Sequence, residues 1–119
     1  MTQTTTTVGQ VIVESIRDAG VTHAFCVPGE SYLGVLDAFN DVPEVSLVAT
    51  HHEEGAGFMA HAMALATGRP GVALVTRAPG LTHLSIALHA AQQDSLPLIA
   101  IVGQVPRPSL GREAFQEVD

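Results

Sequence analysis

Two kinds of hydrophobic pattern alternate along the chain. Apolar residues at a helical spacing predict helices over residues 8–19, 32–40 and 53–67, and a fourth helix that Thr82 caps. Short, continuously apolar runs predict strands over residues 24–27, 45–50, 71–76 and 98–102. Helices and strands therefore alternate from one end of the chain to the other.

Local residues indicate where the first two helices begin and what they bury. Thr7 and Gln10 have the spacing of a capping box, and Gly20 ends the first helix. The buried face of this helix is predicted to contain Val8, Ile12, Ile16 and Ala19. The second helix is predicted to direct Leu33, Leu36 and Phe39 inward.

Glycine and proline punctuate the second half of the chain. Gly68 is expected to end the third helix, and Ala78-Pro79-Gly80 to form a turn before the fourth. Small residues on the third helix allow close packing. The fourth helix is expected to bury Leu84, Ala87, Leu88 and Ala91.

This order of elements defines the fold class. Strands separated by helices form βαβ crossovers, so we expect an α/β fold: a three-layer parallel sheet with helices on both faces. The 119 residues are enough for one domain, over residues 8–119, after a flexible tail of residues 1–7. No acidic residue lies between Glu54 and Asp94, which indicates either a well-covered core or an additional interface with another subunit.

Composition excludes several classes of function. The five basic residues are all arginine, so the chain has neither the lysine of a Walker-type phosphate loop nor one for a Schiff base. The single cysteine, Cys26, cannot form an intrachain disulfide. A net charge of −7 argues against nucleic acid or anionic membranes as partners. With neither a signal-peptide pattern nor a membrane-spanning run, we expect a cytoplasmic protein.

Candidate chemistry lies in the loops that follow the strands, because ligands of open α/β sheets bind beyond the carboxyl ends of the strands. The richest loop is His51-His52-Glu53-Glu54. Its histidines lack the spacing of a metal-binding pair, so no metal site is predicted. Gly55, Gly57 and Ala60 fit a relaxed dinucleotide fingerprint but fall inside a predicted helix, where packing explains them better.

Six short blocks, taken in order, resemble the N-terminal pyrimidine-binding domain of thiamine diphosphate enzymes, with acetolactate synthase and its relatives as the most similar subgroup. The resemblance extends from Val8 to Asp119. The blocks are Phe25-Cys26-Val27-Pro28-Gly29, His52-Glu53-Glu54-Gly55-Ala56, residues 66–72, Val75-Thr76-Arg77-Ala78-Pro79-Gly80, Asp94-Ser95-x-Pro97-Leu98 and Gly103-Gln104-Val105-Pro106.

The resemblance implies a thiamine diphosphate-binding fold and a role for Glu53. In the family, the matching glutamate hydrogen-bonds a pyrimidine nitrogen of the cofactor and starts its activation for reactions of 2-keto acids. Such a carboxyl group has to be held in a dry place. Glu54 is interpreted as a helix-start residue. A second, diphosphate-binding domain of the same or another chain supplies Mg²⁺ and diphosphate binding, and the family forms dimers or tetramers.

Further site residues follow from the same resemblance. Pro28 and Gly29 match a loop that approaches the pyrimidine with its backbone, and Pro79 and Gly80 match a turn that lines the cofactor. Phe115 and Gln116 match residues on the substrate side. Ala78 and His83 stand where glycine and asparagine are usual, and Cys26 and Glu30 replace common glycines. The other histidines are expected at the surface or in packing, with His83 near the edge of the site.

Nothing in the chain resembles the diphosphate-binding half. We therefore expect an N-terminal part of a longer enzyme or one subunit of a split enzyme, inactive alone, that decarboxylates or ligates 2-keto acids as a lyase or transferase. Two alternatives remain open. One is a domain of another family member, such as a 2-keto acid decarboxylase or lyase, and the other is a noncatalytic interaction module.

Overall fold

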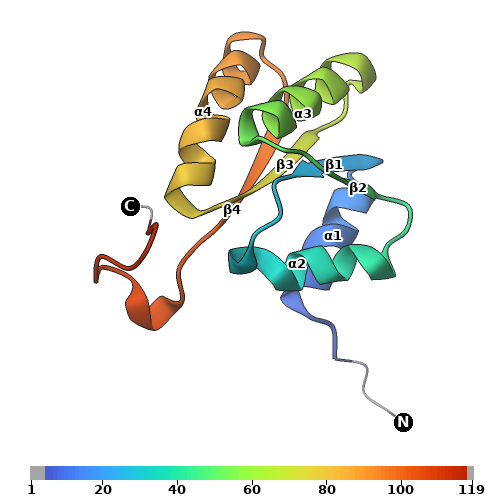
Figure 1. The fold of residues 1–119 in the computed structure, drawn as a ribbon. Helices are drawn as coiled ribbons and strands as arrows, with labels where there is room; N and C mark the ends of the chain where they lie inside the picture. Colours follow the sequence, from blue (N-terminus) through green and yellow to red (C-terminus); the bar gives the residue numbers. More distant parts are fainter. Residues whose placement is uncertain (1–4, 118–119) are drawn as a thin grey trace.

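The computed structural model describes residues 5–117 and has three layers (Figure 1). Helices α1 and α2 cover one face of a parallel sheet, and α3 and α4 cover the other. The predicted three-layer α/β fold is confirmed. The strands are β1 (His23–Cys26), β2 (Ser46–Ala49), β3 (Gly71–Thr76) and β4 (Leu98–Gly103), and the helices are α1 (Val8–Asp18), α2 (Leu33–Ala38), α3 (Glu53–Thr67) and α4 (Arg77–Gln93).

Short 3-10 helices complete the fold at Glu30–Tyr32, Phe39–Asp41 and Arg107–Ser109. Of the predicted N-terminal tail, residues 1–4 lie outside the described part, and residues 5–7 are exposed and without regular structure. No helix between residues 5 and 117 is long and apolar enough to cross a membrane.

The strand order β2-β1-β3-β4 places the first strand inside the sheet. Ala24 of β1 pairs with Leu47 of β2 on one side and with Val72 of β3 on the other, and all pairings are parallel. All four carboxyl ends therefore meet at one edge of the sheet. The connections from β1 and β3 leave this edge toward opposite faces, which creates the type of switch point where α/β proteins bind ligands.

The alternation of side chains along β3 divides the core between the two faces. Val72 and Leu74 pack with α1 and α2, whereas Ala73 and Val75 pack with α3 and α4. All four side chains are fully buried. This explains why the strand reads as a continuous apolar run, since both of its faces are covered by helices.

The Thr7–Gln10 capping box of helix α1 is confirmed, but its buried face is only partly the predicted one. Ile16 is buried and Ile12 is partly buried, as expected, whereas Val8 is 77% exposed and Ala19 is also exposed. Gly9 and Val13 complete the buried stripe. Gly9 faces α2 at close range, since a Cβ atom there would lie 2.2 Å from the Gly34 carbonyl oxygen, and a helical spacing of large apolar residues does not reveal this contact.

Leu33 was wrongly predicted to point inward, since it is 59% exposed. The predicted helix over residues 32–40 is divided into a 3-10 helix, the six-residue α2 and a second 3-10 helix. Because a 3-10 helix has three residues per turn, these transitions change the face that a single α-helical spacing would assign. Phe39, at the other end, is buried as expected.

The predicted turn at residues 78–80 is also wrong, because α4 begins at Arg77 and includes it. Pro79 lies in the first turn of this helix, where backbone N–H groups have no intrahelical acceptor, so proline removes no hydrogen bond. Thr82 is therefore inside the helix and not its cap. The face predicted for α4 is confirmed, since Leu84, Ala87 and Ala91 are buried.

Candidate active site

The loop after β1 and the end of β3 make a close contact at the switch point. A Cβ atom on Gly29 would lie 1.7 Å from Thr76 Oγ1, so only glycine fits between the loop and the strand. Pro28, just before it, is exposed. Glycine is required at position 29 because the loop after β1 lies this close to the end of β3.

Glu53 is the first residue of α3 and follows the loop after β2. His52 caps the helix: its Nδ1 accepts a hydrogen bond from the Glu54 backbone N–H at 3.2 Å. This arrangement places the Glu53 side chain at the carboxyl edge of the sheet with 16% of its surface exposed. The predicted dry position is therefore largely achieved, and the helix N-terminus stabilises negative charge there.

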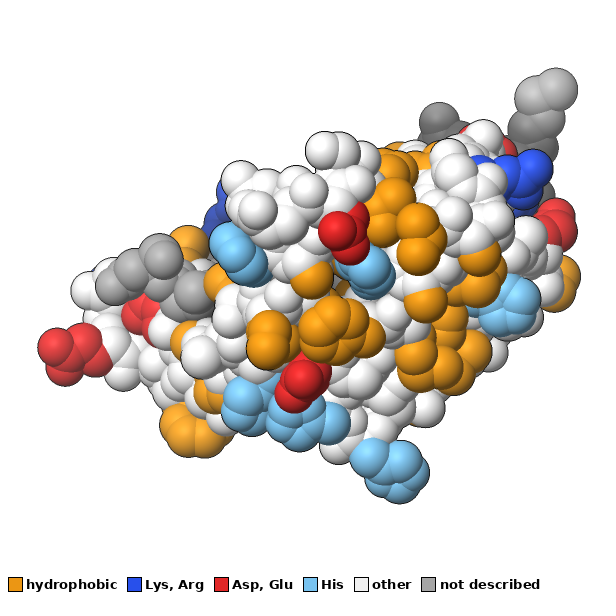
Figure 2. Space-filling view, turned by 90° about the horizontal axis from the view of Figure 1, so that it is seen from above, with side chains coloured by type: hydrophobic (Ala, Val, Ile, Leu, Met, Phe, Trp, Pro, Cys, Tyr) orange, Lys and Arg blue, Asp and Glu red, His pale blue; other side chains and the backbone are white. Residues whose placement is uncertain are grey.

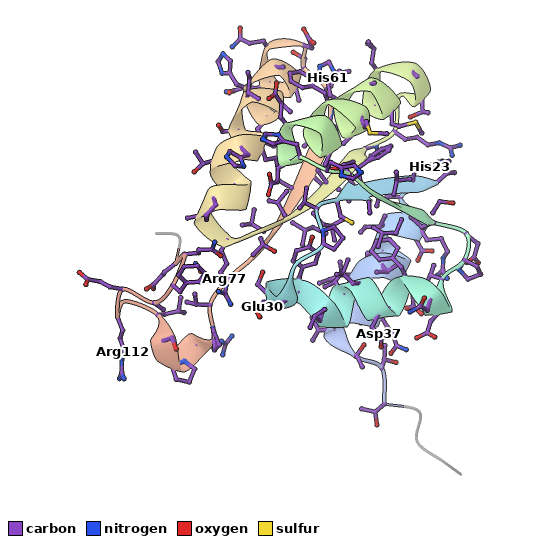
Figure 3. The ribbon with its side chains drawn as sticks, in the orientation of Figure 1. His23, Glu30, Asp37, His61, Arg77 and Arg112 are labelled. Atoms are coloured by element: carbon purple, nitrogen blue, oxygen red, sulfur yellow. The ribbon has the colours of Figure 1, made fainter. Side chains whose placement is uncertain are left out.

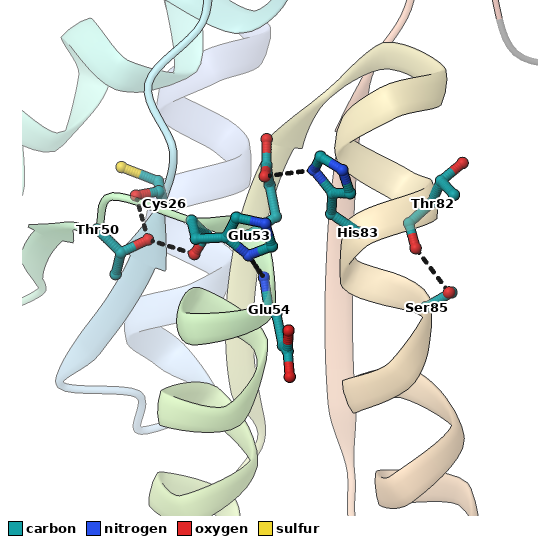
Figure 4. A network of polar contacts seen from close by, with 8 residues as sticks. Cys26, Thr50, Glu53, Glu54, Thr82, His83 and Ser85 are labelled. Carbon is teal, nitrogen blue, oxygen red and sulfur yellow. Dashed lines mark hydrogen bonds and ion pairs between the residues drawn. The ribbon is translucent and has the colours of Figure 1, made fainter.

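A histidine of α4 holds one oxygen of this carboxylate. Nδ1 of His83 lies 2.9 Å from Glu53 Oε2 (Figure 4). When the carboxyl group is ionised it only accepts hydrogen bonds, and Nδ1 is then the donor of this contact. Oε1 of Glu53 accepts no hydrogen bond from any of residues 5–117. His83, which the sequence placed near the site edge, directly contacts Glu53.

The two imidazoles also stack, which joins α3 to α4 at this point. The ring centroids of His52 and His83 are 4.7 Å apart, with an angle of 28° between the ring planes. Because Nδ1 of His52 accepts the Glu54 N–H, the neutral ring carries its proton on Nε2. Glu53 thus belongs to a network in which hydrogen bonds and ring stacking fix the orientation of both imidazole rings.

This network also has the composition of a metal-binding group. One ligand atom each from His52, Glu53 and His83 lie within 4.8 Å of one another. Both Nδ1 atoms, however, already make the hydrogen bonds just described, and His52 would have to give up its cap or its Nε2 proton to bind an ion. The absence of a metal site here remains a prediction.

Thr50 fixes the loop that leads to Glu53. Its hydroxyl lies 3.3 Å from the Cys26 carbonyl oxygen and 3.0 Å from the His52 carbonyl oxygen, so it bridges β1 and the start of α3 (Figure 4). Cys26 itself is fully buried, and burial raises the pKa of its thiol. Cys26 is therefore a packing residue of the core and not a reactive thiol.

Tyr32 is a buried polar residue that the sequence reasoning missed. Its hydroxyl donates to the Val27 carbonyl oxygen and lies 3.3 Å from the Leu74 carbonyl oxygen, so it ties the β1 loop to β3. Burial raises the pKa of Tyr32 well above its usual range, and the charges of Cys26 and Glu53 act in the same direction. A single tyrosine after a Pro-Gly pair was the only available sequence signal.

The remaining predicted site residues lie at the start of α4 and in the segment after β4. Pro79 is exposed, whereas Gly80 is buried and packs on Val75, where a Cβ atom would lie 3.0 Å from the valine Cβ. The Ala78 N–H donates to the Gln116 carbonyl oxygen at 3.0 Å. Phe115 beside it is 77% exposed. These contacts bring Phe115 and Gln116 to the start of α4, while Glu53 joins α4 further along, at His83.

Arg77 is a second residue that sequence reasoning missed. Its guanidinium bonds to Glu30 and to the Phe115 carbonyl oxygen, so it links the segments that follow β1 and β4. Arg77 is one of two arginines in a long stretch without acidic residues, and this was a weak signal because its partners are distant in the sequence.

Comparison with known proteins gives a consistent result. The family model described as thiamine pyrophosphate enzyme, N-terminal TPP binding domain, matches residues 6–119. The chain is 43% identical over 110 residues to an acetolactate synthase of Mycobacterium avium, covering 92% of this chain and 18% of the relative. It is 41% identical over 110 residues to the large subunit of acetolactate synthase isozyme 1 of Escherichia coli K12, covering 92% and 20%. The mitochondrial catalytic subunit of Saccharomyces cerevisiae acetolactate synthase is 40% identical over 111 residues, covering 93% and 16%. The chain thus spans a fifth or less of the length of these relatives.

Proposed function

Because the chain belongs to the thiamine pyrophosphate enzymes, as an N-terminal TPP binding domain, we propose that it supplies the pyrimidine side of a thiamine diphosphate site in an acetolactate synthase-like enzyme. The observation that supports this most directly is the state of Glu53. Its carboxylate is largely buried, is held by His83 through one oxygen, and has its other oxygen available at the ligand-binding edge of the sheet.

The residues present fit the group that the family binds. A largely buried carboxylate fixed at a helix N-terminus can hydrogen-bond a ring nitrogen of an aminopyrimidine. Thiamine diphosphate, when bound, supplies the electron sink for breaking and forming bonds next to a carbonyl group. In this proposal Glu53 holds or releases a proton at Oε1 while His83 fixes Oε2.

Other residues of the proposed site have binding roles. Pro28 and Gly29 present backbone toward the pyrimidine, and the first turn of α4, with Pro79 and Gly80, forms the neighbouring wall. Phe115 and Gln116 lie on the substrate side. In this proposal, Glu53 is the residue that exchanges a proton with the cofactor.

We further propose that a diphosphate-binding domain completes the site and provides the Mg²⁺ and diphosphate contacts. The outer face of α3 and α4 supports this partner, because it exposes large apolar side chains and few charges (Figure 2). Those side chains are Phe58, Met59, Leu65 and Ile86. Such a face favours assembly into dimers or larger oligomers, and the chain alone should bind thiamine diphosphate only weakly.

The proposed substrates are 2-keto acids, and the relatives' names favour the formation of acetolactate over other reactions of this class. A decarboxylase or lyase of the same superfamily is the alternative. Turnover of pyruvate compared with longer or aromatic keto acids distinguishes them. Preference for an aromatic keto acid would favour the alternative.

The decisive experiment is exchange of the cofactor's reactive C2 proton with solvent deuterium, measured by NMR in the enzyme that contains this domain. We expect Glu53→Gln to slow the exchange by about 100-fold or more, because the amide cannot take part in proton transfer. Glu54→Gln is the matched control, because it makes the same change one residue away, at an exposed side chain. Wild-type exchange in Glu53→Gln would refute the role of Glu53.

A further inference from the structure

The segment that follows β4 folds back onto the start of α4 and forms a closed loop. Both carboxylate oxygens of Glu117 accept backbone hydrogen bonds, one from Gly111 and the other from Ala114 at 3.2 Å. These bonds are internal to the segment, so they stabilise its shape but do not attach it to the domain. Attachment depends on the contacts with α4, among them the hydrogen bond from the Ala78 N–H to Gln116.

Arg77 provides the second attachment and extends it to another loop. Its Nη1 donates to the Phe115 carbonyl oxygen at 3.2 Å, and its Nη2 lies 3.2 Å from Glu30 Oε1. Figure 3 shows Arg77 and Glu30 close together, at the start of α4 and beside the loop after β1. One guanidinium thus joins the chain segments that follow β1, β3 and β4.

Two features of Arg77 are unfavourable for stability. Its φ of +51° lies in the left-handed region that a residue with a side chain rarely adopts. Its Nε is buried and has no hydrogen-bond partner among residues 5–117. Strained backbone and unpaired buried donors concentrate at functional sites, where geometry is maintained at the expense of stability. The Arg77 side chain is only 12% exposed, so it is enclosed by the segments that it joins.

We propose that Arg77 is a positioning residue that sets where Phe115 and Gln116 lie relative to the cofactor loop, and thereby controls binding of the keto acid. This rests on the proposed function, in which the 110–117 segment lies on the substrate side. Glu53 is held by a separate contact, with His83, so Arg77 should influence substrate binding and not cofactor activation.

Hydrogen exchange tests the attachment in the chain itself. In Arg77→Met, loosening of the segment should speed exchange of the Ala78 amide about tenfold or more, because its acceptor is Gln116. The Ala114 amide should change little, since its acceptor, Glu117, belongs to the same loop. Arg69→Met is the matched control, because Arg69 also donates to a backbone carbonyl, that of Gly20, at 2.8 Å but lies just before β3, at the amino ends of the strands.

Kinetics of the enzyme that contains this domain test the consequence. For Arg77→Met we expect a rise in KM for the keto acid of about tenfold or more, with cofactor proton exchange at the wild-type rate, and partial recovery in Arg77→Lys. Unchanged Ala78 exchange together with unchanged KM would overturn the proposal. Slowed cofactor exchange in Arg77→Met would also overturn it. Failure of the proposed function is distinct, because it would appear as normal cofactor exchange in Glu53→Gln.

Discussion

Two glycines of α3, two residues apart, should respond in opposite directions to the same substitution. Gly57 packs against α4, where a Cβ atom would lie 2.5 Å from Ala87 Cβ and 2.6 Å from Leu84 Cδ1. Gly55 has nothing within 4 Å of the equivalent position. The pair therefore separates the helix propensity of alanine from its steric effect.

The magnitudes follow from these distances. Replacing glycine by alanine in a helix gains up to about 1 kcal/mol, which is the expected increase in the free energy of unfolding for Gly55→Ala. At Gly57 the same gain is opposed by overpacking, which costs about 1–3 kcal/mol. Leu84 can rotate its methyl group away, but Ala87 Cβ is attached directly to the backbone, so the two helices have to separate. We expect Gly57→Ala to be about 2 kcal/mol less stable than Gly55→Ala.

Urea unfolding of the two variants, followed by circular dichroism, measures this difference. The double variant Gly57→Ala with Ala87→Gly removes the more rigid of the two clashing groups, so a double-mutant cycle should show a favourable coupling of about 1 kcal/mol or more. Equal stability of Gly55→Ala and Gly57→Ala, or no coupling in the cycle, would refute the steric argument. Because Glu53 and His83 lie on the two helices concerned, Gly57→Ala should also lengthen their hydrogen bond.

Three further predictions concern other contacts. Because burial raises the pKa of Tyr32, the unfolded chain loses the phenol proton at a lower pH than the folded chain, and the free energy of unfolding should fall as the pH rises above about 10. Urea unfolding should show a weaker pH dependence of this free energy in Tyr32→Phe than in the wild type, and the same pH dependence in both would contradict this. Gly29→Ala should lower stability by about 1–3 kcal/mol, with partial recovery when Thr76→Ala removes the clashing hydroxyl; a neutral Gly29→Ala would count against so close an approach of the loop to β3. Thr7→Ala should cost about 1 kcal/mol through loss of the helix cap, measured by thermal unfolding, and no change would show that the capping box is dispensable.

The elements with clear boundaries were predictable from sequence. Both α3 and β3 have the predicted limits. Helix α3 ends where expected because Gly68 adopts a left-handed conformation with φ of +66°. The start of α4 was not predictable in this way. Pro79 and Gly80 resemble a turn locally, and only the first turn of a helix tolerates proline without loss of a hydrogen bond.

The candidate site was predictable in part for a similar reason. Glu53 was proposed as a site residue because the family resemblance contains it in one short motif, and its side chain is 16% exposed, in line with the dry position that this role requires. Its partner His83 was not predicted as such, since the contact joins two helices through packing at Gly57 and Ala87. The bonds of Arg77 likewise depend on three loops that meet only in the folded chain. Contacts of this kind leave no periodic pattern in the sequence.

The position of β1 inside the sheet also affects how the chain folds. Ala24 pairs with Leu47 and Val72, and each of these partners follows a complete helical crossover. No hairpin provides an early, local pairing between residues 5 and 117, so loop-closure entropy is lost before any interstrand hydrogen bond forms. During synthesis, one edge of β1 stays unpaired until β3 has been made. A chaperone that shields short apolar segments is expected to bind β1 during this interval. We therefore expect refolding in milliseconds to seconds, with assembly of the central strand pair as the rate-limiting step.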